Sequence, residues 1–247
     1  ASRNIAIKNA RGKYIAILDA DDIALPIRLE KQYEYMEADP EVFLAGSGAH
    51  IIDENGGRTG SFKPVEGHKR IRKILPKTCC LYHPSVMFRN TGEYFYRSKF
   101  INSCEYDLYL RMLTDGKIIA NMPDILIKYR IISMNQSWPK YAKRLLYTDK
   151  AQLFFRQRQS GIEDQYEVFD PREIETADLE GSDDLDVIQA RIRAKFMVGD
   201  IRAGRRDCFL YLRRFGLTQR IWIYLLGSYL SREKRAAVKF FINRFFS

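Results

Sequence analysis

Three aspartates, Asp19, Asp21 and Asp22, follow an apolar run that begins at Tyr14 in the stretch YIAILDADD. In open α/β sheets, ligands bind at the carboxyl ends of the strands, where polar side chains converge without being buried. Asp19 and Asp21 stand two positions apart, so both can reach one ligand where the backbone turns. Two such hard oxygen ligands suit Mg²⁺ or Mn²⁺, with substrate phosphates completing the coordination shell. The same pattern also suits a polar loop in which Asp22 caps the next helix.

The elements around this run alternate between strand and helix. Residues 13–22 are predicted to form a central strand covered on both faces, because the apolar run is nearly continuous. A helix is predicted to open at Pro26 and to pack on the sheet through Ile27, Leu29, Tyr33 and Met36. Residues 42–53 form a second predicted strand, which the turn-forming ENGG ends. This alternation predicts an α/β sheet.

Residues 83–131 carry a second candidate site, on a helix. Residues 83–89 are predicted to form a strand, and a helix is predicted to follow Ser103, which suits its N-cap. That helix has carboxylates in its first turn and an apolar stripe of Leu108, Met112 and Leu113. Residues 116–131 then predict two short strands broken by Pro123.

The character of the chain changes after Trp138, and we place a domain boundary near residue 137. Residues 138–247 are predicted to be a mostly helical C-terminal region. Within it, residues 161–186 hold eleven acidic side chains against one arginine and predict a solvated linker or loop. Residues 201–247 hold eleven Lys and Arg against two acidic residues. The net charge of +10 therefore belongs to this basic, aromatic tail.

Several protein classes are disfavoured by the composition. The four cysteines form no CxxC pair and the three histidines show no metal-ligand spacing, which favours a reduced protein with buried thiols over a disulfide framework. The longest strongly apolar run, IWIYLLGSYL, has about half of the roughly 20 residues that a membrane-spanning helix needs. No helix-turn-helix, RNA-recognition or zinc-finger signature is present, so no nucleic acid partner is expected.

Several stretches, in order, resemble the glycosyltransferase family 2 domain. SRNIAIKNARGKYIAILDADDIALPIRLEKQ is similar to the middle of that domain, and the similarity continues through HPSVMFR, CEYDLYLRML and the pair Tyr129 and Arg130. The resemblance implies a GT-A-like α/β fold, a mixed sheet with flanking helices that is N-terminally incomplete, followed by the mostly helical region. Residues 1–137 would then be the C-terminal portion of a GT-A glycosyltransferase domain.

The resemblance also implies an activity. It is a metal-dependent, inverting transfer of a sugar from a nucleotide-sugar donor, a UDP-sugar, to a glycan or lipid-linked acceptor in cell-surface polysaccharide synthesis. Asp19 and Asp21 match the family's DxD, which binds Mg²⁺ or Mn²⁺ on the donor diphosphate. Asp22 matches a position that supports the loop, and Arg3 matches an arginine near the donor.

Inverting transfer needs a base that takes a proton from the attacking acceptor hydroxyl. Alignment of SCEYDLYLR with the family places Cys104 at the family's Glu and Glu105 at its Asp, so the resemblance implies Glu105 as the base. The extra methylene of Glu105 moves the carboxylate by about one carbon–carbon bond. Asp107 is the rival; two residues further along a helix it points elsewhere, and it also suits the positive end of the helix. His83 is either an acceptor-side contact or a hydrogen-bonded loop histidine.

The family's domain opens with elements that hold the nucleotide base, and nothing before Ser2 supplies them. We expect the chain to be part of a complete enzyme. The alternatives are a chain that needs a partner and a non-catalytic fragment that acts as a scaffold or a membrane-surface interaction protein.

The last residues, REKRAAVKFFINRFF, alternate basic positions with Phe240, Phe241, Phe245 and Phe246. A helix of this kind either lies on an anionic membrane surface or caps the catalytic domain with its aromatic side chains. The expected location is the cytoplasm, peripheral on the inner membrane face if the tail binds lipid.

Overall fold

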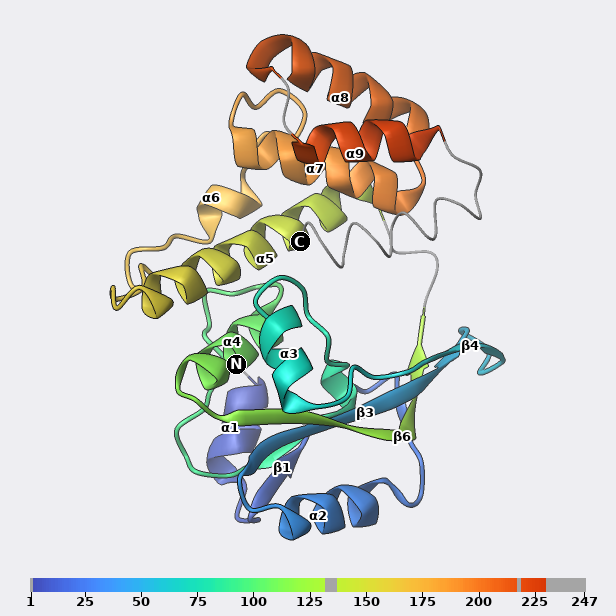
Figure 1. The fold of residues 1–247 in the computed structure, drawn as a ribbon, viewed down its shortest axis with the longest axis vertical. Helices are drawn as coiled ribbons and strands as arrows, with labels where there is room; N and C mark the ends of the chain where they lie inside the picture. The colour runs from blue at the N-terminus through green and yellow to red at the C-terminus, as the bar shows by residue number, and fades with distance from the viewer. Residues whose placement is uncertain (1, 132–136, 217–218, 230–247) are drawn as a thin grey trace. The chain divides into compact units, whose positions relative to one another are not determined.

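The computed structural model describes residues 2–131, 137–216 and 219–229, and it divides the chain into two compact units (Figure 1). Unit 1 comprises residues 1–98, 104–134 and 155–164. Unit 2 comprises residues 99–103, 135–154 and 165–247.

Unit 1 is built on one mixed sheet. Its elements in chain order are α1 (Ser2–Asn9), β1 (Tyr14–Ala16), β2 (Ile23–Ala24), α2 (Arg28–Ala38), β3 (Val42–Ile52), β4 (Arg58–Phe62), α3 (His68–Ile74), the 3₁₀ helix η1 (His83–Ser85), β5 (Met87–Arg89), α4 (Cys104–Thr114) and β6 (Ile118–Arg130). The strand order is β1-β5-β3-β6-β2, with β4 paired to β3 off this path. The long strands β3 and β6 pair in parallel, and the other pairs are antiparallel.

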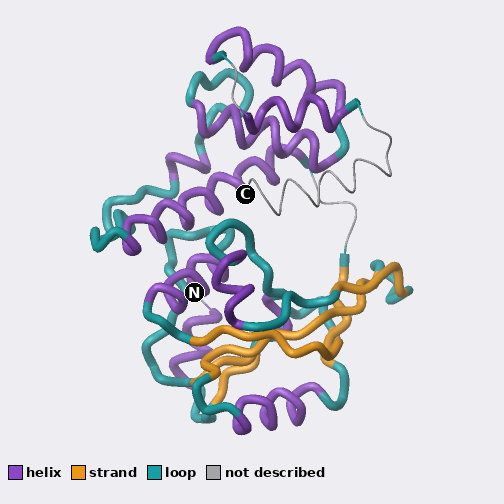
Figure 2. Tube along the Cα trace, viewed as in Figure 1, coloured by secondary structure: helices purple, strands orange, loops and turns teal. Residues whose placement is uncertain are grey.

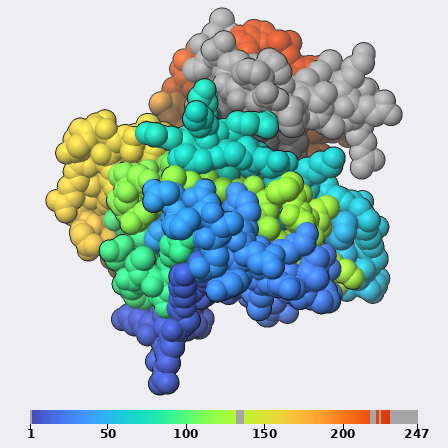
Figure 3. All heavy atoms as spheres, turned by 60° about the horizontal axis from the view of Figure 1, so that its bottom comes forward, coloured from blue at the N-terminus to red at the C-terminus, as the bar shows by residue number. Residues whose placement is uncertain are grey.

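Helices cover both faces of this sheet. Figure 2 shows the strands as one layer, with α2 on one face and α3 on the other, and Figure 3 turns the α2 face of unit 1 toward the viewer. Met36 of α2 is fully buried and packs with Val42, Ala45, Met87 and Ala120. The predicted α/β arrangement of a mixed sheet with flanking helices is confirmed.

The strand that leads to the carboxylates is shorter than predicted and lies at one end of the sheet. Among the described residues, β1 pairs only with β5, and Leu18 beyond it is 47% exposed. One more ladder bond follows, from Ile17 N to Val86 O at 2.9 Å. The Ile17 carbonyl then accepts from Arg28 instead of a strand, and the chain turns. The prediction of a central strand that runs to the carboxylates is therefore wrong for this structure.

The predicted buried face of the following helix is also wrong. α2 begins at Arg28, and its buried residues are Arg28, Gln32 and Met36, spaced by four. The predicted core residues Ile27, Leu29 and Tyr33 are 47%, 58% and 52% exposed. The helix turns its polar residues inward because backbone carbonyls at the strand ends beneath it need hydrogen-bond donors.

Residues 118–130 form one strand rather than two. β6 runs through Pro123, and the register between β3 and β6 shifts between Gly46 and Gly48, opposite that proline. Proline lacks a backbone donor, and an irregularity in the ladder is where a sheet tolerates it.

Unit 2 is helical, as predicted for the C-terminal region. Its helices are α5 (Trp138–Gln159, of which the last residues belong to unit 1), α6 (Arg172–Glu175), α7 (Leu185–Val198), α8 (Ile201–Phe215) and α9 (Gln219–Ser228). α7 begins at an N-cap, Asp184, whose side chain accepts from two backbone N–H groups, and ends at Gly199 in the left-handed conformation. The core of this unit holds Ile188, Ile192, Cys208, Tyr211, Ile221 and Leu225.

The acidic segment 161–186 is more than the solvated loop that its charge predicts. It contains α6, and Phe169, Ile174 and Leu179 within it are buried. Phe169 lies among the rings of Phe100, Tyr147 and Phe154 in unit 2. Apolar residues spaced through an acidic run anchor it, and the side chain of one acidic residue of the run, Asp164, is only 5% exposed.

Within the described residues, no helix combines the length and the apolar character that crossing a membrane requires. The predicted amphipathic tail with Phe240, Phe241, Phe245 and Phe246 lies outside the described residues.

Candidate active site

The three aspartates lie in a tight turn between β1 and β2. The N–H of Asp22 donates to the Asp19 carbonyl at 3.1 Å, which closes the turn. Asp21 is exposed, Asp19 has a side chain that is 30% exposed, and Asp22 is buried. Two of the three carboxylates are therefore available to a ligand.

Arg3 joins this turn to two other elements of unit 1. From α1, its Nη2 donates to Asp19 Oδ1 at 2.9 Å, and its Nη1 lies 3.8 Å from Cys104 Sγ at the start of α4. Its guanidinium also lies over the ring of Tyr96, 5.7 Å from the centroid. Asn4, the next residue of α1, pairs with both the N–H and the carbonyl of Tyr96. The predicted residues Arg3 and Asp19 are thus in direct contact.

The first turn of α4 places Glu105 beside the same group. Cys104 Sγ donates to Glu105 Oε2 at 3.5 Å, and both side chains are partly exposed. Burial, together with the negative charge of the Glu105 carboxylate, raises the pKa of the Cys104 thiol to about 11. The thiol therefore stays protonated at neutral pH and serves as a weak donor to Glu105, and it is not a nucleophile.

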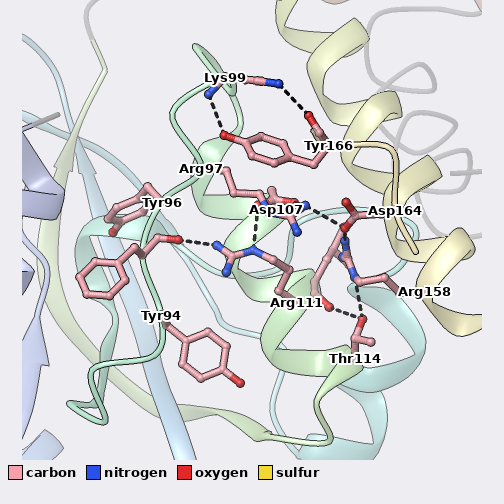
Figure 4. A network of polar contacts seen from close by, with 12 residues as sticks. Tyr94, Tyr96, Arg97, Lys99, Asp107, Arg111, Thr114, Arg158, Asp164 and Tyr166 are labelled. Atoms are coloured by element: carbon pink, nitrogen blue, oxygen red, sulfur yellow. Dashed lines mark hydrogen bonds and ion pairs between the residues drawn. The ribbon is translucent and has the colours of Figure 1, made fainter. Parts of the chain in front are cut away.

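Asp107 lies in a different environment from Glu105. It is fully buried, 3.0 Å from Arg111 Nε and 3.7 Å from Arg97 Nη1. Figure 4 shows Asp107 turned toward these arginines. Asp164 contacts Arg97 at 2.8 Å and pairs with Arg158, which donates to Thr114. The carboxylate of Asp107 is thus enclosed by cations of its own unit.

His83 is held by two tyrosines. Its Nδ1 lies 2.7 Å from the hydroxyl of Tyr109 and its Nε2 lies 3.2 Å from the hydroxyl of Tyr96. Burial lowers the pKa of the His83 imidazole, although the carboxylates of Glu105 and Asp19 oppose the change. Because Tyr96 also lies under Arg3, His83 connects to the Arg3–Asp19 pair through one side chain.

Asp22 is tied to the far end of β6 and does not cap α2. The N-cap of α2 is Ile27, with no side-chain cap bond, whereas Asp22 Oδ1 accepts from the N–H of Arg130 at 2.8 Å. Burial raises the pKa of the Asp22 carboxyl to about 6, the Arg130 N–H opposes this, and the neighbouring Asp21 and Asp19 add to it. Asp22 thus supports the turn, and the capping alternative is overturned.

The oxygen ligands of this turn fit a hard dication for which phosphate and water supply much of the coordination shell. The described residues contain no group of three or more His, Cys, Asp or Glu that could enclose a metal on their own. Asp19 and Asp21 supply two carboxylates, and the buried Asp22 Oδ2 has no hydrogen-bond partner. Mg²⁺ is bound in proteins in just this manner, through one or two carboxylates and the phosphates of its substrate.

Four further residues around the turn were not found from the sequence. Arg28 is buried and binds the carbonyl of Ile17, two residues before Asp19, and Gln32 is buried beside Arg28. Tyr96 and Tyr109 hold His83. The spacing Arg28, Gln32, Met36 is a stripe of period four that could have indicated a buried face, but its polar members weigh against burial on any hydropathy scale.

Comparison with known proteins finds similar sequences for part of the chain. Residues 1–94 match the model of Glycosyl transferase family 2. The chain is 42% identical over 151 residues to the "Uncharacterized glycosyltransferase MJ1057" of Methanocaldococcus jannaschii, covering 60% of this chain and 52% of that protein. Over 159 residues it is 37% identical to the "O-antigen biosynthesis glycosyltransferase WbnJ" of Escherichia coli, covering 62% and 60% respectively. Over this region the chain is similar to glycosyltransferase family 2.

A third relative has a name that states its donor and acceptor. It is the "UDP-Glc:alpha-D-GlcNAc-diphosphoundecaprenol beta-1,3-glucosyltransferase WfgD" of Escherichia coli, 32% identical over 141 residues, covering 57% of this chain and 54% of that protein. The chain spans between about half and three fifths of the lengths of these three relatives.

Proposed function

We propose that the protein carrying this chain transfers a sugar, with inversion and with a divalent metal ion, from a UDP-sugar to a glycan or lipid-linked acceptor in cell-surface polysaccharide synthesis. The observation that carries the proposal is the convergence of Asp19, Arg3 and the Cys104–Glu105 turn in a family 2 chain. The names of two relatives, an O-antigen enzyme and a transferase acting on a diphosphoundecaprenol-linked sugar, support the acceptor class.

In this proposal Glu105 is the base. One of its carboxylate oxygens takes the proton of the acceptor hydroxyl, while the oxygen of that hydroxyl forms a bond to the anomeric carbon of the donor sugar. The bond from the anomeric carbon to the phosphate oxygen breaks, and its electron pair leaves with the nucleoside diphosphate. Attack opposite the leaving group inverts the anomeric centre. The burial of Asp107 between two arginines favours Glu105 over Asp107 in this role.

The departing diphosphate needs positive charge. Mg²⁺ or Mn²⁺ held by Asp19 and Asp21 would supply it. Arg3 lies beside Asp19 and is the described cation best placed to contact the same phosphates. His83 remains the acceptor-side candidate, although both of its ring nitrogens are already engaged by tyrosine hydroxyls.

The test uses the protein that carries this sequence, a panel of UDP-sugars and lipid-linked acceptors, and release of UDP as the readout. Transfer that requires Mn²⁺ or Mg²⁺ and stops with EDTA supports the proposal, and no transfer from any donor in the panel contradicts it. Glu105→Gln should abolish transfer and leave donor binding nearly unchanged, whereas the matched variant Glu41→Gln, an exposed carboxylate before β3, should leave both unchanged. Near-normal turnover of Glu105→Gln removes that residue from the role of base.

We also propose that unit 2 contacts an anionic membrane surface, because α8 has an exposed stripe of suitable composition. Phe209 and Leu210 are 54% and 55% exposed, while Cys208 and Tyr211 face the core. Exposed arginines flank the two apolar side chains at helical spacing, namely Arg202, Arg206 and Arg213. Apolar side chains between cations are the composition by which a helix lies in the interface of an anionic bilayer.

Flotation with vesicles of phosphatidylcholine alone and with added phosphatidylglycerol tests this contact. Binding should require the anionic lipid, and the double variant Arg206→Glu, Arg213→Glu should lose it. Deletion of residues 231–247 separates the contribution of the tail from that of α8. Equal flotation of wild type and the double variant would rule out α8 as the contact.

A further inference from the structure

A buried arginine, Arg28, binds the backbone at the end of the strand that leads to the carboxylate turn. Arg28 is 1% exposed, and its Nη2 donates to the carbonyl of Ile17 at 2.7 Å and to the carbonyl of Val86 at 3.3 Å. Among the described residues it forms no ion pair with a carboxylate, and burial lowers its pKa to about 10. Burying a cation is costly unless its donors are satisfied, so the backbone carbonyls at the end of β1 and before β5 are the reason it is stable there.

Gln32, one helical turn further, continues this arrangement. It accepts from Arg28 Nε at 2.9 Å, and its own Nε2 donates to the carbonyls of Ala45 and Ser85 at 3.0 and 2.9 Å. The buried polar face of α2 therefore holds the backbone of β3, of the η1–β5 connection and of the residue that follows β1.

A second arginine binds the other end of the turn. Arg130 closes β6, and its Nε donates to the Asp21 carbonyl at 2.9 Å. Its Nη1 donates to the carbonyls of Asp53 and Glu54 at 3.0 and 2.9 Å, and its backbone N–H donates to Asp22 Oδ1. One guanidinium thus joins the carboxylate turn to the β3–β4 turn.

Both guanidinium groups bind backbone carbonyls and leave the ligand side chains alone. Ile17 O lies two residues before Asp19, and Asp21 O belongs to the second proposed ligand, so the two contacts bracket the pair. A guanidinium presents five donors in a rigid plane, which suits one group spanning several carbonyls; an ammonium on a flexible stem does not hold such a geometry.

We propose that Arg28 and Arg130 are positioning residues that together fix the spacing and direction of the Asp19 and Asp21 carboxylates. The inference rests on the proposed function, because it gives the turn a metal and a diphosphate to receive. Groups that orient metal ligands without touching the metal typically change metal affinity by about 10–100-fold when altered, and this is the effect expected here.

Arg130 is the better residue to vary, because it is partly exposed whereas Arg28 is buried. Arg130→Lys keeps the charge and removes the planar fork. The matched control is Lys128→Gln, which removes a cation from the same strand two residues earlier. Binding of Mn²⁺ to the protein without donor is followed by loss of the free-ion signal in electron paramagnetic resonance, and the Mn²⁺ dependence of kcat and KM is measured alongside.

Arg130→Lys should weaken Mn²⁺ binding and raise the Mn²⁺ concentration for half-maximal rate, each by about tenfold or more. The KM for the acceptor should stay unchanged, and saturating Mn²⁺ should restore most of kcat. A purely structural role would change thermal unfolding without this metal-dependent rescue. Wild-type Mn²⁺ binding by folded Arg130→Lys overturns the inference.

Two further measurements distinguish failure of the proposed metal site from failure of the proposed role of the arginines. Asp19→Asn should abolish Mn²⁺ binding; if it does not, the proposed metal site fails independently of the arginines. Hydrogen exchange of the wild-type protein covers the case in which Arg130→Lys does not fold. If the turn is held at both ends, the Asp22 amide should exchange as slowly as the amides of β6. Exchange of the Asp22 amide at the rate of a free loop overturns the inference.

Discussion

The enclosed carboxylate of Asp107 gives the sharpest prediction. If its role is structural, removing its charge lowers the stability and leaves turnover; if it is the base, removing its charge abolishes turnover and leaves the stability. Asp107→Asn removes the charge from a side chain that is 0% exposed and leaves Arg111 and Arg97, with side chains 15% and 23% exposed, short of one anion. Removing one partner of a buried ion pair costs about 3–5 kcal/mol of unfolding free energy. Asp164 still neutralises Arg97, so we expect the lower end, about 3 kcal/mol.

Urea unfolding measures that free energy, and thermal unfolding should show a midpoint lower by roughly 6–12 °C for a domain of this size. Below the midpoint, folded Asp107→Asn should retain turnover, whereas Glu105→Gln should lose it at unchanged stability. Thr114→Val is a control on the same helix, because it removes a hydroxyl that Arg158 contacts without changing charge. An Asp107→Asn variant with wild-type stability and abolished turnover would refute the reasoning and make Asp107 the base.

Three other expectations follow from burial. Burial lowers the pKa of His83 below the ordinary value of 6.5, so the unfolded chain binds more protons than the folded chain. The free energy of unfolding should therefore fall as the pH drops through 6.5, by up to about 1.4 kcal/mol per pH unit. Urea unfolding against pH should show this slope, and His83→Asn should flatten it. Ile192→Ala, at a fully buried position in unit 2, should cost about 2–5 kcal/mol of unfolding free energy, and a cost below 1 kcal/mol in urea unfolding would contradict the packing described. Alkylation followed by mass spectrometry should modify exposed Cys79 first and Cys80 and Cys208 last, because burial raises the pKa of the latter two to about 12; equal rates would contradict this order.

The fold class was predictable because it depends on alternation, which the sequence carries openly. Apolar runs separated by turn residues gave the strands, and the helix predicted to follow Ser103 begins at Cys104. The predicted strand ends and buried helix faces were wrong where hydrogen bonds of a polar side chain determined them. β1 ends at Ala16 although the apolar run continues to Leu18, because the Ile17 carbonyl binds Arg28 and leaves the ladder.

The candidate site shows the same division. The positions of Asp19, Arg3 and Glu105 came from a family pattern, and helical spacing alone indicated that Glu105 and Asp107 point in different directions. Spacing could not reveal that Asp107 would meet Arg97, because that contact depends on how the loop before α4 folds back. Nor could it reveal Arg28 beneath the turn, since periodicity ranks an arginine as a surface residue.

The backbone contacts of Arg28 explain why this chain buries an arginine. An apolar residue in place of Arg28 would remove the side-chain donor of the Ile17 carbonyl, whereas the Val86 carbonyl would keep its bond from the Ile17 N–H. An unsatisfied buried carbonyl costs about 1–3 kcal/mol. A carboxylate there would add negative charge beneath Asp19 and Asp21, which already repel each other. A cation bound to backbone carbonyls satisfies the strand ends without adding negative charge. Hydrogen bonding to this backbone is thus why a helix face that looks wrong by hydropathy is stable at the edge of the sheet.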